Sequence, residues 1–170
     1  MKILTKTALA LLVVATAACT NPDRFGAGNS PAPMGAAGAG VGSAADPATT
    51  AYFNQTVGDR VLFAVDSSSL TEAAKAVLDG QTQWLLTNSN YRAVIEGHAD
   101  EQGTREYNLA LGFRRANAVR EYLVSRGVPA ARLEVTSYGK ERPVEVCSQE
   151  SCYSQNRRAV TVLAVSSFSS

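Results

Sequence analysis

Residues 91–127 read YRAVIEGHADEQGTREYNLALGFRRANAVREYLVSRG and contain the clearest strand and helix patterns of the chain. Residues 91–97 alternate imperfectly between apolar and polar side chains and predict a strand. After a short polar segment, apolar residues recur at helical spacing over residues 104–126. Gly127, with Pro129 just beyond it, is a stop signal for that helix. The stretch therefore predicts a strand joined to a long helix by a polar loop.

Further strand and helix patterns lie on both sides of this stretch. Ser69 and Glu72 form a capping box that starts a helix extending to about Thr87. The order of elements is β-α-β-α-β-loop-β, which predicts α/β or α+β packing. The other strands are expected over residues 61–65, residues 133–138 and residues 159–165, the last almost wholly apolar and therefore central.

A charged residue lies on the apolar face of the long helix. Arg115 falls between Leu111 and Val119 in this face, and Asn108 lies a further turn back. A guanidinium on an inward face needs a carboxylate partner, because an unpaired buried charge is costly, and Asp100 in the preceding loop is the candidate. The pair is interpreted either as a structural salt bridge or as a site for the amine and carboxylate of a zwitterion. The carboxyl end of a strand and the first amides of a helix favour the ligand.

The N-terminal residues have the parts of a lipoprotein signal. Lys2 and Lys6 precede an apolar run that is too short to span a bilayer, and residues 16–19 (TAAC) resemble a bacterial lipobox. Thr20 stands where an Asp would favour retention at the inner membrane. We therefore expect a signal peptide over residues 1–18 and an acylated Cys19. A flexible tether rich in Gly, Ala and Pro would extend to residue 50, followed by one domain over residues 51–170.

Composition argues against several functional classes. Sixteen Lys and Arg against fifteen Asp and Glu give a formal charge of +1, too balanced for a protein that binds nucleic acid by neutralising phosphates. One His and three Cys are little material for a zinc cluster, and no metal or other cofactor is expected. The sequence contains neither a nucleophile elbow nor a phosphate loop, so an enzyme is not expected.

Two cysteines predict a disulfide. Cys147 and Cys152 lie close together in a chain that is expected to be exported. Their spacing lacks the two intervening residues of thioredoxin-like redox sites. We expect a structural bridge that contributes about 2 kcal/mol.

Several blocks of sequence resemble the OmpA-like peptidoglycan-binding domain. The blocks are GHADEQGT (residues 97–104), YNLALG (residues 107–112), RRA (residues 114–116), SYGKERP (residues 137–143) and NRRAV (residues 156–160). The resemblance covers about residues 61–163 in the family's order and spacing. It implies an α+β sandwich whose helices pack on one mixed four-stranded sheet, and a module that binds without catalysis.

The resemblance also implies a ligand, the diaminopimelate of a peptidoglycan stem peptide. Asp100 would pair with the amine and Arg115 with the carboxylate at the free end of that residue. The resemblance also places around the pocket the loop from Phe63 to Asp66, together with Thr104, Asn108 and Leu111.

With the lipobox and the tether, the resemblance implies a lipoprotein of the outer membrane that faces the periplasm. It would link outer-membrane lipid, through acylated Cys19, to the cell wall and help to constrict the outer membrane in cell division. The implied protein partners are the Tol system and its β-propeller protein TolB. Two other classes stay open: a periplasmic protein-interaction scaffold with a structural Asp100/Arg115 pair, and a periplasmic hydrolase or redox protein that depends on His98 or the cysteines.

Overall fold

One mixed sheet organises the computed structural model, which describes residues 44–165. The central strand β4 is antiparallel to both of its neighbours, whereas β2 and β3 are parallel. The predicted mixed four-stranded sheet is therefore confirmed, and so is the central place of the most apolar strand. In spatial order the strands are β1 (Arg60–Leu62), β4 (Arg158–Val165), β2 (Tyr91–His98) and β3 (Leu133–Gly139).

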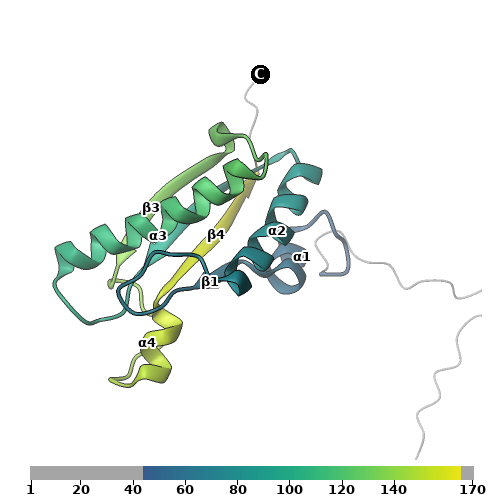
Figure 1. Cartoon of the computed structure of the whole chain (residues 1–170). Coiled ribbons are helices and arrows are strands. Elements are labelled where there is room, and N and C mark those ends of the chain that lie inside the picture. Colours follow the sequence, from purple (N-terminus) through teal and green to yellow (C-terminus); the bar gives the residue numbers. More distant parts are fainter. Residues whose placement is uncertain (1–43, 166–170) are drawn as a thin grey trace, which may run out of the picture. The chain divides into compact units, whose positions relative to one another are not determined.

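Two long helices bury one face of this sheet. α3 (Arg105–Ser125) packs on β2, β3 and β4, and α2 (Glu72–Thr87) packs on β1 and on α3. Figure 1 shows α3 running along the strands that it covers, with α2 near β1. The fully buried side chains at this interface include Leu78, Ile95 and Leu123.

The two helices start on threonine caps. Thr71, not Ser69, caps α2, because its side-chain oxygen accepts a hydrogen bond from the Ala74 amide at 3.1 Å. Ser69 is held in the preceding turn, where its own amide donates to Ser67 Oγ at 3.1 Å. Thr104 caps α3 in the same way. After α3, Gly127 adopts a φ of +103°, as expected of the predicted stop signal.

Several short elements had no signal in the sequence. α4 (Glu150–Asn156) lies in the segment that was expected to be a loop, and a 3-10 helix (Ala130–Arg132) precedes β3. Before β1 the chain forms α1 (Thr50–Tyr52) and a π-helical turn (Phe53–Gly58). All are short, so a helical repeat of apolar side chains does not develop in them.

The residues just before α1 are held against the domain. The Trp84 indole N–H donates to the Pro47 carbonyl at 2.7 Å, and the Tyr91 hydroxyl donates to the Ala48 carbonyl at 3.2 Å. The last part of the expected tether, residues 44–50, therefore belongs to the folded unit. The expected signal peptide, Cys19 and the rest of the tether lie outside the described residues.

Two glycines let α3 approach the sheet backbone to backbone. A Cβ placed on Gly97 of β2 would lie 1.8 Å from the Gly112 carbonyl oxygen, and one placed on Gly112 would lie 2.4 Å from Ser137 Oγ. This contact sets the first half of α3 beside the carboxyl end of β2. The polar residues of α3 and of the loop after β2 are thereby brought together.

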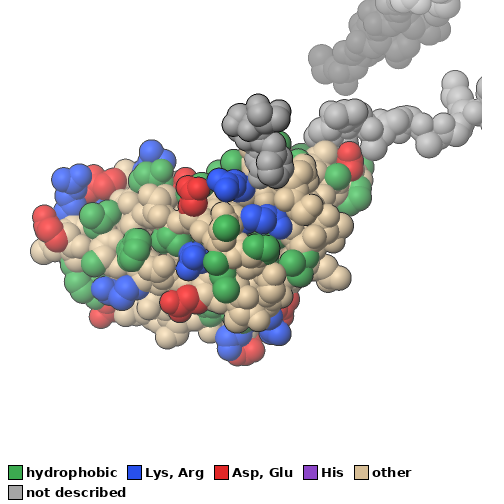
Figure 2. Space-filling view, turned by 90° about the horizontal axis from the view of Figure 1, so that it is seen from above, with side chains coloured by type: hydrophobic (Ala, Val, Ile, Leu, Met, Phe, Trp, Pro, Cys, Tyr) green, Lys and Arg blue, Asp and Glu red, His purple; other side chains and the backbone are tan. Residues whose placement is uncertain are grey.

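The surface carries charges of both signs. On the face drawn in Figure 2, Lys and Arg side chains alternate with Asp and Glu, and hydrophobic side chains are scattered among them. Within residues 44–165, no helix is long and apolar enough to cross a bilayer.

Candidate functional site

A pocket of about 260 Å³ opens at the carboxyl end of β2. It lies between the loop after β1, the loop that joins β2 to α3, and the first three turns of α3. This is the edge of the sheet at which the sequence predicted a ligand. The lining residues are Val65, Asp66, Asp100, Gln102, Gly103, Tyr107, Asn108, Leu111 and Arg115.

Arg115 is fully buried, and backbone carbonyls hold its guanidinium. Nε donates to Ser67 at 2.8 Å, one terminal nitrogen donates to His98 at 2.9 Å, and the other donates to Ala64 at 3.0 Å. The Phe63 ring lies 5.3 Å from the guanidinium carbon. The expected salt bridge to Asp100 is therefore wrong, because three carbonyl dipoles take the place of a carboxylate.

Arg115 keeps its charge and part of its donor capacity at neutral pH. Burial lowers its pKa to about 10, and the nearby charge of Asp100 opposes this shift. A guanidinium has five N–H groups, so two remain for an anion after the three carbonyl bonds. The geometry thus presents a buried cation that still has donors to offer.

Asp100 is paired with a different arginine. Its Oδ2 accepts from Arg157 at 3.1 Å, and its Oδ1 accepts from the Gln102 amide at 3.2 Å. Only 8% of Asp100 is exposed. Arg157 also bonds the Glu150 carboxylate, and this bond raises the pKa of Arg157 and lowers that of Glu150. Asp100 therefore has a fixed orientation before any ligand arrives.

Asp66 and Tyr107 form the rim of the pocket. The Tyr107 hydroxyl donates to the Asp66 carboxylate, and this bond raises the pKa of Tyr107. Asp66 has a φ of +51°, in the left-handed region that Asp enters more readily than most residues. Val65 beside it is 58% exposed. The rim thus presents a second carboxylate next to an apolar side chain.

Asn108 supports the floor of the site from α3. Its side-chain amide donates to the carbonyls of Asp100 at 3.2 Å and of Gln102 at 2.8 Å. The loop that carries Asp100 is therefore fastened to the same helix that carries Arg115.

Comparison with known proteins places the chain in a family. Residues 62–157 match the OmpA family. The chain is 61% identical to the peptidoglycan-associated lipoprotein of Rhizobium meliloti over 132 residues, 77% of this chain and 75% of that protein. It is 51% identical to the peptidoglycan-associated lipoprotein of Agrobacterium fabrum over 152 residues, 89% of this chain and 83% of that protein. The chain belongs to the peptidoglycan-associated lipoprotein family. The resemblance to OmpA-like domains is confirmed, and the chain is an envelope-associated lipoprotein.

Solved structures show the same fold. The crystal structure of the peptidoglycan-associated lipoprotein from Burkholderia pseudomallei aligns with a TM-score of 0.65 at 39% identity, over 70% of this chain and all of that one. The C-terminal domain of Helicobacter pylori MotB aligns with a TM-score of 0.60 at 17% identity, over 64% of this chain and 86% of that one. The second likeness concerns the fold alone.

The structure brings most of the predicted residues of this family member to one pocket. Phe63 and Thr104 are exceptions, since Phe63 packs beneath the Arg115 guanidinium and Thr104 caps α3. The predicted residues that do line the pocket are Asp66, Asp100, Asn108, Leu111 and Arg115.

Sequence reasoning missed other residues of the site. Gln102, Gly103 and Tyr107 lie within the quoted sequence blocks, and Tyr107 precedes Leu111 by one helical turn, which was an available signal. Val65 was not missed, since it belongs to the loop of residues 63–66 that was expected around the pocket, and it does line the pocket. Arg157 stood among several arginines, and its spacing did not mark it as the partner of Asp100.

His98 and the cysteines lie outside this pocket lining. Burial, together with the charges of Arg158 and Arg142, lowers the pKa of His98 to about 4, so the ring is neutral at pH 7. Its ring packs beside Tyr138, with centroids 5.6 Å apart. Cys147 and Cys152 form the predicted disulfide. Among residues 44–165, no cluster of three or more His, Cys, Asp and Glu side chains is arranged to hold a metal.

Proposed function

We propose that this lipoprotein binds peptidoglycan non-covalently and so ties the outer membrane to the cell wall, without catalysing a reaction. One observation carries the proposal: a single pocket contains an oriented carboxylate, Asp100, and a buried guanidinium, Arg115, that keeps two unused N–H groups. A pocket with one fixed charge of each sign suits a small zwitterion.

The ligand that fits is the free end of a diaminopimelate residue in a stem peptide. Its ammonium group bonds Asp100, whose carboxylate has lone pairs left after its bonds to Arg157 and Gln102. Its carboxylate takes the remaining donors of Arg115. A lysine in the same position lacks that carboxylate and leaves the buried donors unpaired, which costs binding free energy.

The cellular role follows from the expected anchor. An acylated Cys19 holds the chain in the outer membrane, because each buried methylene contributes about 0.8 kcal/mol. The tether lets many domains bind the same cell wall at once. Each contact is weak, but avidity makes the combined linkage strong. In this role the protein is a component of the Tol-Pal system, TolB competes for the head, and the linkage supports constriction of the outer membrane in cell division.

Calorimetric titration of the full chain in detergent tests the proposal. We expect binding of a diaminopimelate stem peptide, at least tenfold weaker binding of its lysine counterpart, and loss of binding in Asp100→Asn. The matched control is Asp79→Asn, on the exposed face of α2, which should bind as the wild type does. Circular dichroism verifies that each variant is folded.

A lack of binding would contradict the proposal. If the wild type binds neither peptide, the wall-binding proposal fails and the protein-interaction scaffold becomes the leading interpretation. Metabolic labelling with palmitate tests the anchor separately, and a Cys19→Ala chain that still incorporates label would contradict it.

A further inference from the structure

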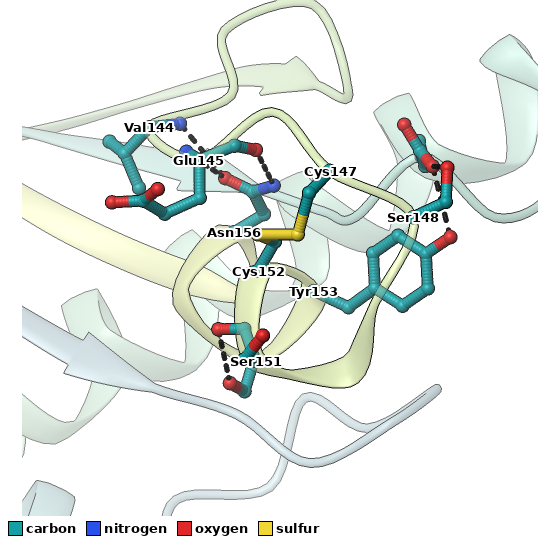
Figure 3. The surroundings of a disulfide bond; sticks show 10 residues. Val144, Glu145, Cys147, Ser148, Ser151, Cys152, Tyr153 and Asn156 are labelled. Atoms are coloured by element: carbon teal, nitrogen blue, oxygen red, sulfur yellow. Dashed lines mark hydrogen bonds between the residues drawn. A yellow bond between two sulfur atoms is a disulfide. The ribbon is translucent and has the colours of Figure 1, made fainter.

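A short segment after β3, which we call the α4 segment (residues 144–156), is closed on itself twice. The Cys147–Cys152 disulfide joins its loop to α4. Asn156 adds a second closure, since its side chain accepts from the amides of Val144 and Glu145 and donates to the Glu145 carbonyl at 2.7 Å. Figure 3 shows the bridge with Asn156 on one side and Tyr153 on the other.

The first contact from this segment to the pocket passes through Arg157. Arg157 is only 4% exposed, and one terminal nitrogen lies 3.1 Å from Asp100 Oδ2 and 3.3 Å from Glu150 Oε2. Glu150 stands at the start of α4, between the two cysteines. One buried guanidinium is thus shared between a carboxylate of the pocket and a carboxylate of the α4 segment.

The second contact reaches the neighbouring residue of the pocket loop. The Tyr153 hydroxyl donates to Glu101 Oε1 at 2.9 Å, and the Ser148 hydroxyl donates to the same oxygen at 3.3 Å. In Figure 3 the Tyr153 ring extends from α4 toward Ser148. Two consecutive residues of the loop, Asp100 and Glu101, are therefore held from the α4 segment.

We propose that the disulfide-closed α4 segment is a positioning element of the pocket, which orients Asp100 toward the amine of the ligand through Glu150 and Arg157. The ligand in this statement rests on the proposed function. The contacts on which it depends are those of Glu150, Arg157 and Glu101.

Electrostatics explains why the segment matters for binding. Arg157 is buried and needs counter-charge, and Glu150 supplies part of it. Without Glu150, Asp100 is the one carboxylate among residues 44–165 that still bonds this guanidinium, and Arg157 draws it away from an incoming ammonium. A helix of seven residues is marginal by itself, so the disulfide and the Asn156 bonds together keep Glu150 and Tyr153 in place.

The test uses full-length protein and two stem peptides, one with diaminopimelate and one with 2-aminopimelate, which lacks the distal amine. The variants are Cys147→Ser/Cys152→Ser and Glu150→Gln. The control is Glu145→Gln in the same segment, whose backbone but not its side chain bonds Asn156. We expect both variants to bind the diaminopimelate peptide about tenfold more weakly and the 2-aminopimelate peptide as the wild type does.

Two outcomes would overturn the proposal. Equal losses for both peptides would show general damage to the domain, and unchanged affinity for the diaminopimelate peptide would show that the α4 segment does not orient Asp100. Glu150→Gln keeps the test decisive if the double cysteine variant fails to fold.

A second readout does not depend on ligand. The Gln102 amide donates to Asp100 Oδ1, so its NMR resonance reports the orientation of that carboxylate. In Glu150→Gln this resonance should shift or broaden, and in Glu145→Gln it should not. If the wild type binds neither peptide, the proposed function fails. If the Gln102 resonance does not move in Glu150→Gln, the positioning role of the α4 segment is refuted, whatever the peptides show.

Discussion

The guanidinium of Arg115 on α3 donates to the carbonyl oxygen of His98, at the last residue of β2, over 2.9 Å. With the bonds to Ala64 and Ser67, this contact fastens the long helix to the end of its strand and to the loop after β1. The cation proposed to bind ligand is therefore also a structural tie. Its replacement should affect stability as well as binding.

Arg115→Lys should destabilise the domain by about 2 kcal/mol or more. A lysine keeps the charge but has one nitrogen, which does not reach three carbonyls that lie in different directions. Urea unfolding followed by circular dichroism measures the loss. The adjacent Arg114→Lys is the control, because Arg114 is exposed. Equal midpoints for the two variants would contradict the structural role.

His98 should make stability fall in mildly acidic solution. Its pKa is about 4 in the folded protein against 6.5 in the unfolded chain, so the unfolded state binds the extra proton first. The stability that depends on neutral His98 is complete above pH 6.5 and is lost progressively as the pH falls toward 4, by up to about 3 kcal/mol.

The comparison with His98→Gln isolates this effect, because the carboxylates titrate in both proteins. Urea unfolding at a series of pH values from 4 to 7 should give a steeper loss in the wild type than in the variant. If the free energy of unfolding falls with pH equally in the two proteins between pH 4 and 7, His98 does not titrate as expected.

Gly97→Ala should destabilise the domain by about 3 kcal/mol or prevent folding. The added methyl would lie 1.8 Å from the carbonyl oxygen of Gly112, so α3 must move away from β2. Gly80→Ala is the matched control within α2, where the methyl meets only Val57 Cγ1 at 3.5 Å. We expect that control to gain about 0.5–1 kcal/mol in thermal or urea unfolding, since alanine favours the helix. A Gly97→Ala variant with the same free energy of unfolding as the wild type would refute the close packing of α3 on β2.

Trp84→Phe should loosen the residues before α1. It removes the 2.7 Å bond to the Pro47 carbonyl and part of a buried ring that packs on Phe53, so it costs about 2 kcal/mol or more, while Tyr91→Phe removes only a longer, exposed bond and costs less. Hydrogen exchange followed by mass spectrometry should show faster exchange in residues 49–53 of Trp84→Phe. Identical exchange in the two variants would mean that the indole N–H does not hold this segment.

The long periodic elements could be predicted from the sequence alone. The almost wholly apolar run of residues 159–165 predicted a central strand, and β4 does lie between β1 and β2. α3 carries a capping threonine, an apolar face and a terminal glycine, so its ends were readable to within a residue. α4 could not be predicted in this way, because seven residues that are held by a disulfide and by Asn156 need no helical pattern of their own.

Asp100 and Arg115 could be singled out from the sequence, but their partners could not. The position of Arg115 within an apolar face showed that a cation would be buried. Its acceptors proved to be backbone carbonyls, which every residue carries, so no side-chain pattern could mark them. Arg157 lies 57 residues from Asp100 in the chain, and Arg158 beside it carries the same charge. Only the fold decides between the two, because the turn from α4 into β4 sets Arg157 against the pocket loop, whereas Arg158 begins β4 and donates to the Arg142 carbonyl.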